Sequence, residues 1–505
     1  MSGYNVRLFG ASGDGSNKDT QAIQRAIDTC GEAGGGTVVV PSGVYIVGTI
    51  VMRDHVNLHL DSGAVLRLSD DREDYLFPTQ YEGKFSGVSY PAMIYGKHLR
   101  HVTISGKGRL DGQDEKFWTP LEYAENDIGK SMFVHFKPKT WRPMMLLFEQ
   151  CWDVTVETIT FERSPVYAGW MIECERLRIQ GVSVQHHFHG PNTDGFHLSS
   201  CRHVRISDSD FHTGDDSIAI DGDGHGPAEH ITITNCTFTS LNNMCRLFTG
   251  IDPWHDGTAA AGGETVRHVA ISNCTVHNAA GALNLVAKNG TIEHVTVSNI
   301  TLRMRLPGVP IFLMADQGTI RNVTISHLIA EANGVCTVSG KPGDVIDGIR
   351  ITDCQFDIKP VPKIYGHGLP DPIPSYPAYH FAPYGIYLRH AREIELREIR
   401  INWLGELQGE SWSALQGLDL DRLEINGFVA DKAGSDNRVP AIRLTDVRRV
   451  YIDGCRTIGH SDIYLQVEGT DLKRIKLGPT NDFTLISDES ESTIRYQSSS
   501  LERNR

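Results

Sequence analysis

Three aspartates close together in the sequence are the residues best suited to chemistry. Asp194 lies in the stretch Asn192–His197 (NTDGFH), and Asp215 and Asp216 lie in the stretch Gly214–Ile220 (GDDSIAI). Both stretches continue into apolar sequence that is typical of β-strands. Carboxyl groups that are held close together cannot all ionise freely, so at least one is expected to have a raised pKa. Such a cluster can combine a proton donor with ionised proton acceptors.

An internal repeat predicts how these aspartates are positioned. Each copy is a short segment in which apolar and polar residues alternate, and successive copies lie 26 to 38 residues apart. The clearest copies begin at His203, His230, His268, His294, Asn322 and Gly348. One copy cannot bury its own apolar face, whereas stacked copies can. The repeat therefore predicts an all-β fold, a right-handed parallel β-helix, which is a solenoid of about a dozen coils.

The sequence also predicts what lies at the two ends of the solenoid. Residues 1–36 are expected to form an N-terminal cap segment with a short amphipathic capping helix, and residues 37–485 the β-helix catalytic domain. Within it, residues 359–384 are rich in Pro and Tyr and predict a long loop. Residues 486–505 are polar and predict a disordered tail. The apolar stripe of the expected helix contains Ala22, Ile23, Ala26, Ile27 and Cys30.

Composition disfavours several classes of partner. The net charge of −14 argues against nucleic acid or an anionic membrane surface as the main partner. No apolar run is long enough to span a bilayer. The N-terminus shows no basic segment followed by an apolar one, so a cytoplasmic location is expected unless a leader was removed. The ten cysteines include no CxxC pair and are expected to be free, buried thiols. The oligomeric state cannot be predicted.

Two columns of polar residues are attributed to the repeat and not to chemistry. One column consists of His101, His203, His230, His268 and His294. The other consists of Asn235, Asn273 and Asn299, with Asp208 and Asp353 in register. Stacked polar side chains at the turns of a β-helix can hydrogen-bond from coil to coil. Both columns are therefore expected to be structural.

The repeat predicts how the three aspartates lie relative to one another. Asp194 and Asp216 fall at the same position of neighbouring coils, with backbones roughly 5 Å apart, and Asp215 lies beside them. A proton donor next to carboxylates that activate water is what hydrolysis of a glycosidic bond requires. An aspartate ladder at a solvated turn and a calcium site are the structural alternatives. The next coil has Leu241–Asn243 at these positions, which argues against a ladder.

The two aspartate stretches resemble the leading signatures of the polygalacturonase-like glycoside hydrolases, family 28. Ile104–Gly112, Arg142–Met145 and Ser164-Pro165 are similar to further stretches of that family, and the resemblance covers roughly residues 5 to 460. It implies an inverting hydrolase on a right-handed β-helix. It also implies that Asp215 is the general acid, that Asp194 and Asp216 position and deprotonate the attacking water, and that Asn192 orients this centre.

The sequence departs from the family pattern at two signatures. The place of Gly-His-Gly reads Leu241–Asn243, and a separate Gly-His-Gly around His225 lies in a loop that could fold over the site. The place of Arg-Ile-Lys reads Gly281–Leu285, with Arg246 and Lys288 as the cations nearby. Without the usual Arg/Lys pair, a carboxylate substrate loses its best charge-assisted partner. The substrate is therefore expected to be a neutral sugar, or an anionic sugar bound by Arg246 and Lys288, and not plain polygalacturonate.

Other residues are candidates for lining a substrate cleft. Trp170, Trp254 and His255 fall in segments that border the aspartates, and their rings could stack on sugars or simply pack at the rim. His189 and His197 are predicted to be polar groups of the cleft, and Asn242 to contact substrate. Histidines 186, 187, 189, 197 and 212 have no spacing diagnostic of a metal site. No metal or cofactor is predicted.

Three functions remain open on the sequence. The first is an inverting glycoside hydrolase that acts on a pectin-type or other plant or microbial oligo- or polysaccharide, in an exo manner if the long loop closes one end of the groove. The second is a β-helix lyase or epimerase of uronates, which would use Arg or Lys as base, often with calcium. The third is a non-catalytic carbohydrate-binding β-helix.

Overall fold

The computed structural model describes most of the chain and divides it into two compact units, Met1–Cys274 and Thr275–Arg505. The described residues are 3–77, 90–121, 134–222, 226–250, 263–304, 308–333, 336–359, 384–405, 407, 411–459, 461–469, 475–490 and 493–498. Each unit is built from coils of a right-handed parallel β-helix, which confirms the predicted fold class. Within the described ranges, no helix is long and apolar enough to cross a membrane.

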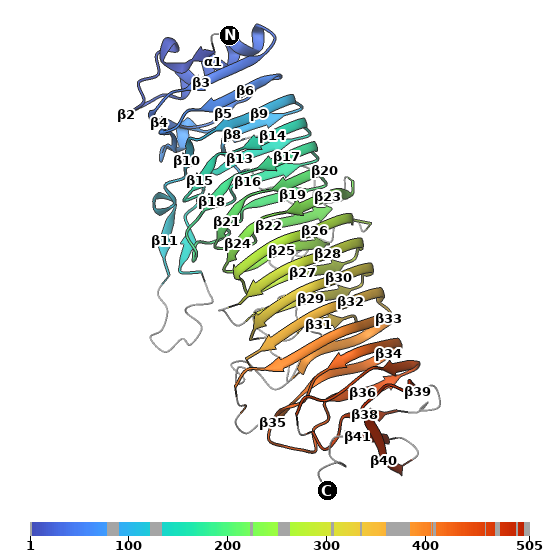
Figure 1. The fold of residues 1–505 in the computed structure, drawn as a ribbon. Coiled ribbons are helices and arrows are strands. Elements are labelled where there is room, and N and C mark those ends of the chain that lie inside the picture. Colours follow the sequence, from blue (N-terminus) through green and yellow to red (C-terminus); the bar gives the residue numbers. More distant parts are fainter. Residues whose placement is uncertain are drawn as a thin grey trace. The chain divides into compact units, whose positions relative to one another are not determined.

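The coils of the first unit place their strands in three rows, and each strand pairs in parallel with the equivalent strand of the next coil (Figure 1). The first row contains β5 (Ile50–Val51), β8 (Ala92–Lys97), β13 (Met144–Glu149), β16 (Gly169–Ile172), β19 (Phe196–Ser199), β22 (Ile218–Gly222) and β25 (Asn243–Thr249). The second row contains β1 (Tyr4–Asn5), β3 (Gly36–Val40), β6 (Val56–Leu60), β9 (Arg100–Gly106), β14 (Trp152–Glu157), β17 (Glu175–Gln180), β20 (Arg202–Ser207), β23 (Ala228–Thr234) and β26 (Thr265–Asn278). The third row contains β2 (Asp14–Lys18), β4 (Gly43–Val47), β7 (Ala64–Leu68), β10 (Arg109–Asp111), β15 (Thr160–Glu162), β18 (Ser183–Gln185), β21 (Asp210–Thr213) and β24 (Thr237–Ser240).

A single α-helix among the described residues, α1 (Thr20–Glu32), covers the N-terminal end of this unit near β3 (Figure 1). It buries Ala22, Ile23, Ala26, Ile27 and Cys30, as the apolar stripe predicts. A hydrophobic face of this kind closes the core that would otherwise be open at the first coil. Segments that connect the strands contain three short 3-10 helices, at Val6–Phe9, Arg72–Asp74 and Asp114–Lys116. They also contain an antiparallel pair of strands, β11 (Trp118–Pro120) and β12 (Phe136–Pro138).

The second unit continues the parallel pattern with longer strands. One row contains β27 (Gly281–Lys288), β29 (Val309–Asp316), β31 (Cys336–Ser339), β36 (Ile442–Val447) and β38 (Leu465–Glu468). Another contains β28 (Thr291–Arg303), β30 (Thr319–Ala332), β32 (Val345–Ile358), β37 (Val450–Asp453) and β39 (Ile475–Leu477). The strands β33 (Tyr384–Trp403) and β34 (Ser411–Val429) belong to both rows, and β35 (Ala433–Gly434) pairs with β34.

The C-terminal prediction was wrong for part of its range. Residues 486–505 were expected to be disordered, but β40 (Phe483–Ser490) pairs antiparallel with β41 (Thr493–Ser498), which also pairs with β38. Backbone hydrogen bonds along the edge of β38 hold β41, and Phe483 at the start of β40 is buried, with its ring centre 5.1 Å from that of Tyr464 and 5.6 Å from that of Tyr496. The predicted loop at 359–384 falls almost entirely outside the described residues, of which only Lys359 and Tyr384 belong to it.

The two polar columns occupy positions with a left-handed backbone within or next to the strands. The φ angles of His101, His203, His230, His268 and His294 lie between 54° and 58°, and those of Asn235, Asn273 and Asn299 are 56°. Asn, Asp and His tolerate this conformation better than other residues with a side chain. The backbone conformation, as well as bonding such as Asn235 Nδ2 to Asp208 Oδ1 at 3.2 Å, therefore explains the repeat positions. All ten cysteines are buried and free, as predicted.

Candidate active site

Strand pairing brings Asp194 and Asp216 to the same position of adjacent coils. Phe196 of β19 pairs with Ile218 of β22, and each aspartate lies two residues before its strand residue. The N–H of Gly195 donates to the carbonyl oxygen of Asp216 at 3.0 Å. A Cβ at Gly195 would lie 2.2 Å from the carbonyl oxygen of Ser217, so a glycine after Asp194 allows the two backbones to come this close.

The three carboxylates form one cluster. Asp194, Asp215 and Asp216 each place an oxygen within 4.8 Å of the others. Asp194 and Asp216 are buried, whereas Asp215 is half-buried and is the most accessible of the three. Burial raises the pKa of Asp194 well above its usual 3.8, and the charges of Asp215 and Asp216 raise it further. The Oδ1 of Asp194 has no hydrogen-bond partner among the described residues.

Two amides from the next coil hold the carboxylates of Asp215 and Asp216. Asn242 Nδ2 donates to Asp215 Oδ1 at 2.7 Å, and Asn243 Nδ2 donates to Asp216 Oδ1 at 2.6 Å. The register of β22 with β25 places Asn243 directly beside Asp216. We predicted that Asn242 contacts substrate, but its amide contacts the catalytic candidate Asp215. Asn243 was not among the predicted site residues, although its place in the repeat, one coil after Asp216, was a signal for it.

Asp215 accepts further hydrogen bonds. Its Oδ1 accepts from the N–H of Asp216 at 2.9 Å, and its Oδ2 lies 3.4 Å from Asn192 Nδ2. Arg246 Nη1 lies 3.7 Å from Asp216 Oδ2, and its guanidinium carbon lies 4.5 Å from the centre of the Phe248 ring. Arg246 is thus part of the cluster, and its charge partly offsets the rise in the pKa of Asp194.

Arg142 fixes the exposed side chain of Asn192. Its Nη2 donates to Asn192 Oδ1 at 2.7 Å, and its Nη1 donates to the carbonyl oxygens of Pro191 at 2.6 Å and Pro165 at 3.2 Å. Three acceptors from two segments orient one guanidinium, which orients the amide that faces Asp215. The sequence identified Arg142 only through a family motif. Its partners are mainly backbone carbonyls, which leave no pattern in the sequence.

His197 has a different place from the one predicted for it. It was expected to be a polar group of the cleft, but it is 4 % exposed and its Nε2 lies 2.5 Å from Asp221 Oδ2. Asp221 also accepts from Ser199 Oγ at 3.1 Å, and Ser199 Oγ accepts from Trp170 Nε1 at 2.9 Å. Buried polar groups need such partners, and this network links β16, β19 and β22. Asp221 was missed, because a single Asp within a buried strand carries no distinctive signal in the sequence.

Trp170 is packed against its neighbours. It is 3 % exposed, and the centre of its ring lies 6.0 Å from that of Tyr90 and 6.3 Å from that of Tyr167. Of the two interpretations of Trp170, packing fits the structure and stacking on a sugar does not. His189 stacks on His135 with 3.9 Å between ring centres, in the segments that precede the aspartates.

Four further predicted residues are not part of the described site of the first unit. His225, Trp254 and His255 lie outside the described residues. Lys288 ends β27 and belongs to the second unit. Among the described residues, groups of potential metal ligands close enough to share one ion are the three aspartates and Glu229 with His230 and His268. Histidines 186, 187, 189, 197 and 212 are not part of either group.

Comparison with solved structures places this fold in a known class. The exopolygalacturonase of Thermotoga maritima has a TM-score of 0.60 and 21 % sequence identity, with 79 % of this chain and 91 % of that chain covered. The family 28 exopolygalacturonase of Yersinia enterocolitica has a TM-score of 0.62 and 17 % identity, with 84 % and 77 % covered. Both solved structures show that the fold of this chain is a parallel β-helix of the kind found in exopolygalacturonases.

Sequence comparison then gives the family. The family model of glycosyl hydrolases family 28 matches residues 30–317, so the chain belongs to this family. A probable polygalacturonase of Vitis vinifera is 29 % identical over 221 residues, which are 42 % of this chain and 43 % of the grape protein. The chain thus spans less than half the length of this curated relative.

Proposed function

We propose that the chain is a glycoside hydrolase that cleaves a pectin-type oligo- or polysaccharide. The observation that carries this proposal is the cluster of Asp194, Asp215 and Asp216, with oxygens within 4.8 Å of one another on adjacent coils. Neighbouring carboxylates that retain a proton can act as acid and base in one site. Family membership supports the same reaction class.

The three aspartates take different roles in this mechanism. Asp215 donates its proton to the leaving glycosidic oxygen, because it is the aspartate that remains accessible. Asp194 and Asp216 accept the proton of a water molecule as its oxygen bonds to the anomeric carbon and the glycosidic bond breaks. The Oδ1 of Asp194, which has no partner among the described residues, can accept a hydrogen bond from this water.

The protonation states of the three aspartates depend on one another. In the free protein the raised pKa falls on Asp194, whereas donors surround Asp215 and favour its ionised form. Interacting carboxyl groups titrate together, so one proton is shared among them. In the proposed mechanism this proton is on Asp215 when substrate is bound, which leaves Asp194 ionised to accept the proton of water.

We propose inversion at the anomeric carbon, as the resemblance implies. Asp194 and Asp216 are both buried and can hold one water molecule between them. This arrangement supports a mechanism in which that water directly displaces the leaving group at the anomeric carbon. The short spacing of the carboxylates is the specific observation that favours the alternative, a retaining reaction through a covalent intermediate, since retaining sites place their two carboxyl groups about 5–5.5 Å apart. The anomer of the first-formed product, followed by NMR, decides between the two.

The substrate class is part of the proposal. The names of the related proteins, exopolygalacturonases and a probable polygalacturonase, support a galacturonate-containing substrate and an exo mode. Arg246 supports a carboxylated sugar, but its guanidinium already faces Asp216. We therefore propose a pectin-type substrate that differs from plain polygalacturonate.

The decisive experiment compares Asp215→Asn with a matched control. Asp215→Asn cannot donate a proton, and we expect it to lose about a hundredfold or more of kcat, the usual value of general acid catalysis. Asp210→Asn, at the exposed first residue of β21, removes the same charge on the same unit and is expected to keep full activity. Retention of more than about a tenth of the activity by Asp215→Asn would refute its role. An unsaturated product that absorbs ultraviolet light, with loss of activity in chelator, would instead indicate a lyase.

A further inference from the structure

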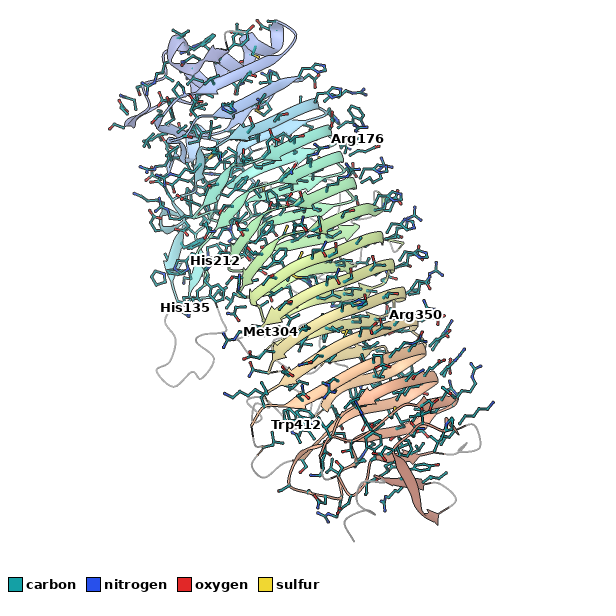
Figure 2. All side chains as sticks on the ribbon, viewed as in Figure 1. His135, Arg176, His212, Met304, Arg350 and Trp412 are labelled. Carbon is teal, nitrogen blue, oxygen red and sulfur yellow. The ribbon has the colours of Figure 1, made fainter. Side chains whose placement is uncertain are left out.

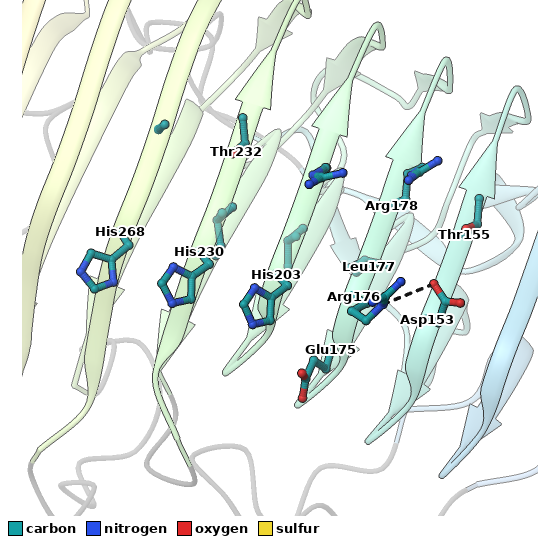
Figure 3. Close-up of a pocket in the computed structure, with 14 residues that line it drawn as sticks. Asp153, Thr155, Glu175, Arg176, Leu177, Arg178, His203, His230, Thr232 and His268 are labelled. Atoms are coloured by element: carbon teal, nitrogen blue, oxygen red, sulfur yellow. Dashed lines mark ion pairs between the residues drawn. The ribbon is translucent and has the colours of Figure 1, made fainter.

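A hollow on the second row of strands is separate from the candidate active site. It has a volume of about 760 Å³ and is lined by side chains of β14, β17, β20, β23 and β26 (Figure 3). The three aspartates precede strands of the first row instead. Figure 2 shows Arg176, from the hollow, on one side of the first unit and His135 and His212 on the other.

Two arginines in this hollow are opposed without a counter-ion. Arg178 of β17 and Arg205 of β20 are register partners on neighbouring parallel strands, and both are exposed. Neither has an acidic partner among the described residues. Directly opposed like charges destabilise a sheet. The positions that flank this pair along the row are the neutral Thr155 and Thr232, so no charge in register offsets them.

The charges next to this pair are arranged differently. The adjacent column alternates in sign, and its members form ion pairs: Arg202 lies 3.2 Å from Glu175, and Arg267 lies 2.7 Å from Glu229. The same strands therefore carry compensated charges at one position and two uncompensated guanidinium groups three residues further on. The pair is therefore open to an anion from outside the chain.

A row of imidazole rings lies beside the arginines. The rings of His203, His230 and His268 stack in parallel, with 5.0 Å between successive ring centres and interplanar angles of 8° and 9° (Figure 3). Their nitrogen atoms can exchange hydrogen bonds with hydroxyl groups. The row follows the stacking direction of the coils, so its polar groups repeat at the spacing of the strands, about 4.8 Å.

We propose that this hollow is a second, non-catalytic binding surface for a carboxylated polysaccharide. Arg178 and Arg205 bind carboxylates through their guanidinium forks, and the histidine row contacts hydroxyl groups of the same saccharide chain. The requirement for an anion rests on the two arginines, whereas the choice of a uronate polymer rests on the proposed function. A second contact on the same molecule raises the apparent affinity for a long polymer above that for a short substrate.

Binding of polygalacturonate tests the proposal in the Asp215→Asn background, where cleavage is expected to be suppressed. Affinity electrophoresis compares Arg178→Ala/Arg205→Ala with Arg109→Ala/Arg303→Ala, which loses the same charge from exposed arginines that pair with acids elsewhere. We expect at least a tenfold weaker binding for the first variant and unchanged binding for the second. Methyl-esterified pectin, which lacks most carboxylate charges, is expected to bind weakly to every form.

Two results would overturn the proposal. One is equal binding of polygalacturonate by the two double variants, since the arginines of the hollow would then have no special role. The other is equal binding of esterified and unesterified polymer, since binding would then not depend on the carboxylate charge of the polymer.

Hydrolysis of a short oligosaccharide is expected to be unchanged in Arg178→Ala/Arg205→Ala. If no form hydrolyses any substrate, the proposed function fails while the binding comparison still stands. Arg178→Gln/Arg205→Gln repeats the test, with folding checked by circular dichroism.

Discussion

Asn243 lies one coil beyond Asp216, in register with it, and donates a hydrogen bond of 2.6 Å to its carboxylate. Hydrogen bonds to charged groups contribute about 1.5–3 kcal/mol. We expect Asn243→Ala to lower kcat by tenfold or more, because Asp216 loses the donor that orients it. Asn235→Ala is the matched control, since Asn235 makes the same type of bond to Asp208 at an exposed turn. Equal kcat for the two variants would show that the buried amide has no part in the reaction.

The raised pKa of Asp194 predicts a dependence of stability on pH. The folded protein holds this proton more tightly than the unfolded chain, so the cost of ionising Asp194 appears as the pH rises above about 3.8. Asp194→Asn removes that cost. Its melting temperature is expected to match the wild type near pH 3 and to exceed it increasingly towards pH 7. Thermal unfolding of both proteins across this range checks the sign, and a difference that shrinks with rising pH would contradict it.

The buried contact of His197 with Asp221 is expected to stabilise the fold. Asp221→Ala leaves His197 without this acceptor and removes the acceptor of Ser199, so we expect the free energy of unfolding to fall by about 3 kcal/mol. The double variant His197→Phe/Asp221→Leu replaces both polar groups with apolar ones and is expected to recover part of the loss. Denaturant titration measures both effects, and a double variant less stable than Asp221→Ala would contradict the argument.

Arg142→Lys tests whether the guanidinium geometry matters. A lysine keeps the charge but cannot hold Asn192 and two backbone carbonyls with a rigid fork. We expect kcat to fall by about tenfold, which corresponds to about 1.4 kcal/mol, because Asn192 is no longer fixed against Asp215. Arg109→Lys, at an exposed ion pair, is the control and is expected to keep its kcat. The kinetic comparison needs a melting curve of each variant, so that a loss of folded protein is not read as a loss of rate.

The sequence was sufficient to predict the arrangement of the aspartates. The repeat fixes where each coil begins, so the sequence alone assigns Asp194 and Asp216 to the same position of neighbouring coils. The buried face of α1 followed from its apolar stripe for a similar reason, since helical periodicity is strong over this length. Periodic sequence predicts periodic structure.

The contacts around the aspartates could not be predicted in the same way. A repeat gives the position of a residue in its coil but not the partner of its side chain, so the hydrogen bond from Asn242 to Asp215 could not be predicted. Asp221 depends on His197 from the previous coil, and Arg142 on carbonyl oxygens that any residue could supply. The strands β40 and β41 were missed because the composition of residues 486–505 was weighed as a whole, although Thr493–Ser498 alternates polar and apolar residues, and backbone bonding to an edge has no signature in composition.

The burial of every cysteine has a practical consequence. Thiol-reactive dyes need access to the thiolate, so the ten native thiols, which are all buried, are expected to react slowly. Burial also raises the pKa of Cys336 and Cys455. One cysteine introduced at an exposed position, such as Thr232 in the hollow, would then take a single fluorophore without removal of the native ones. Such a labelled protein would report the binding of a polysaccharide on the second row of strands by a change in fluorescence emission, with all native cysteines still in place.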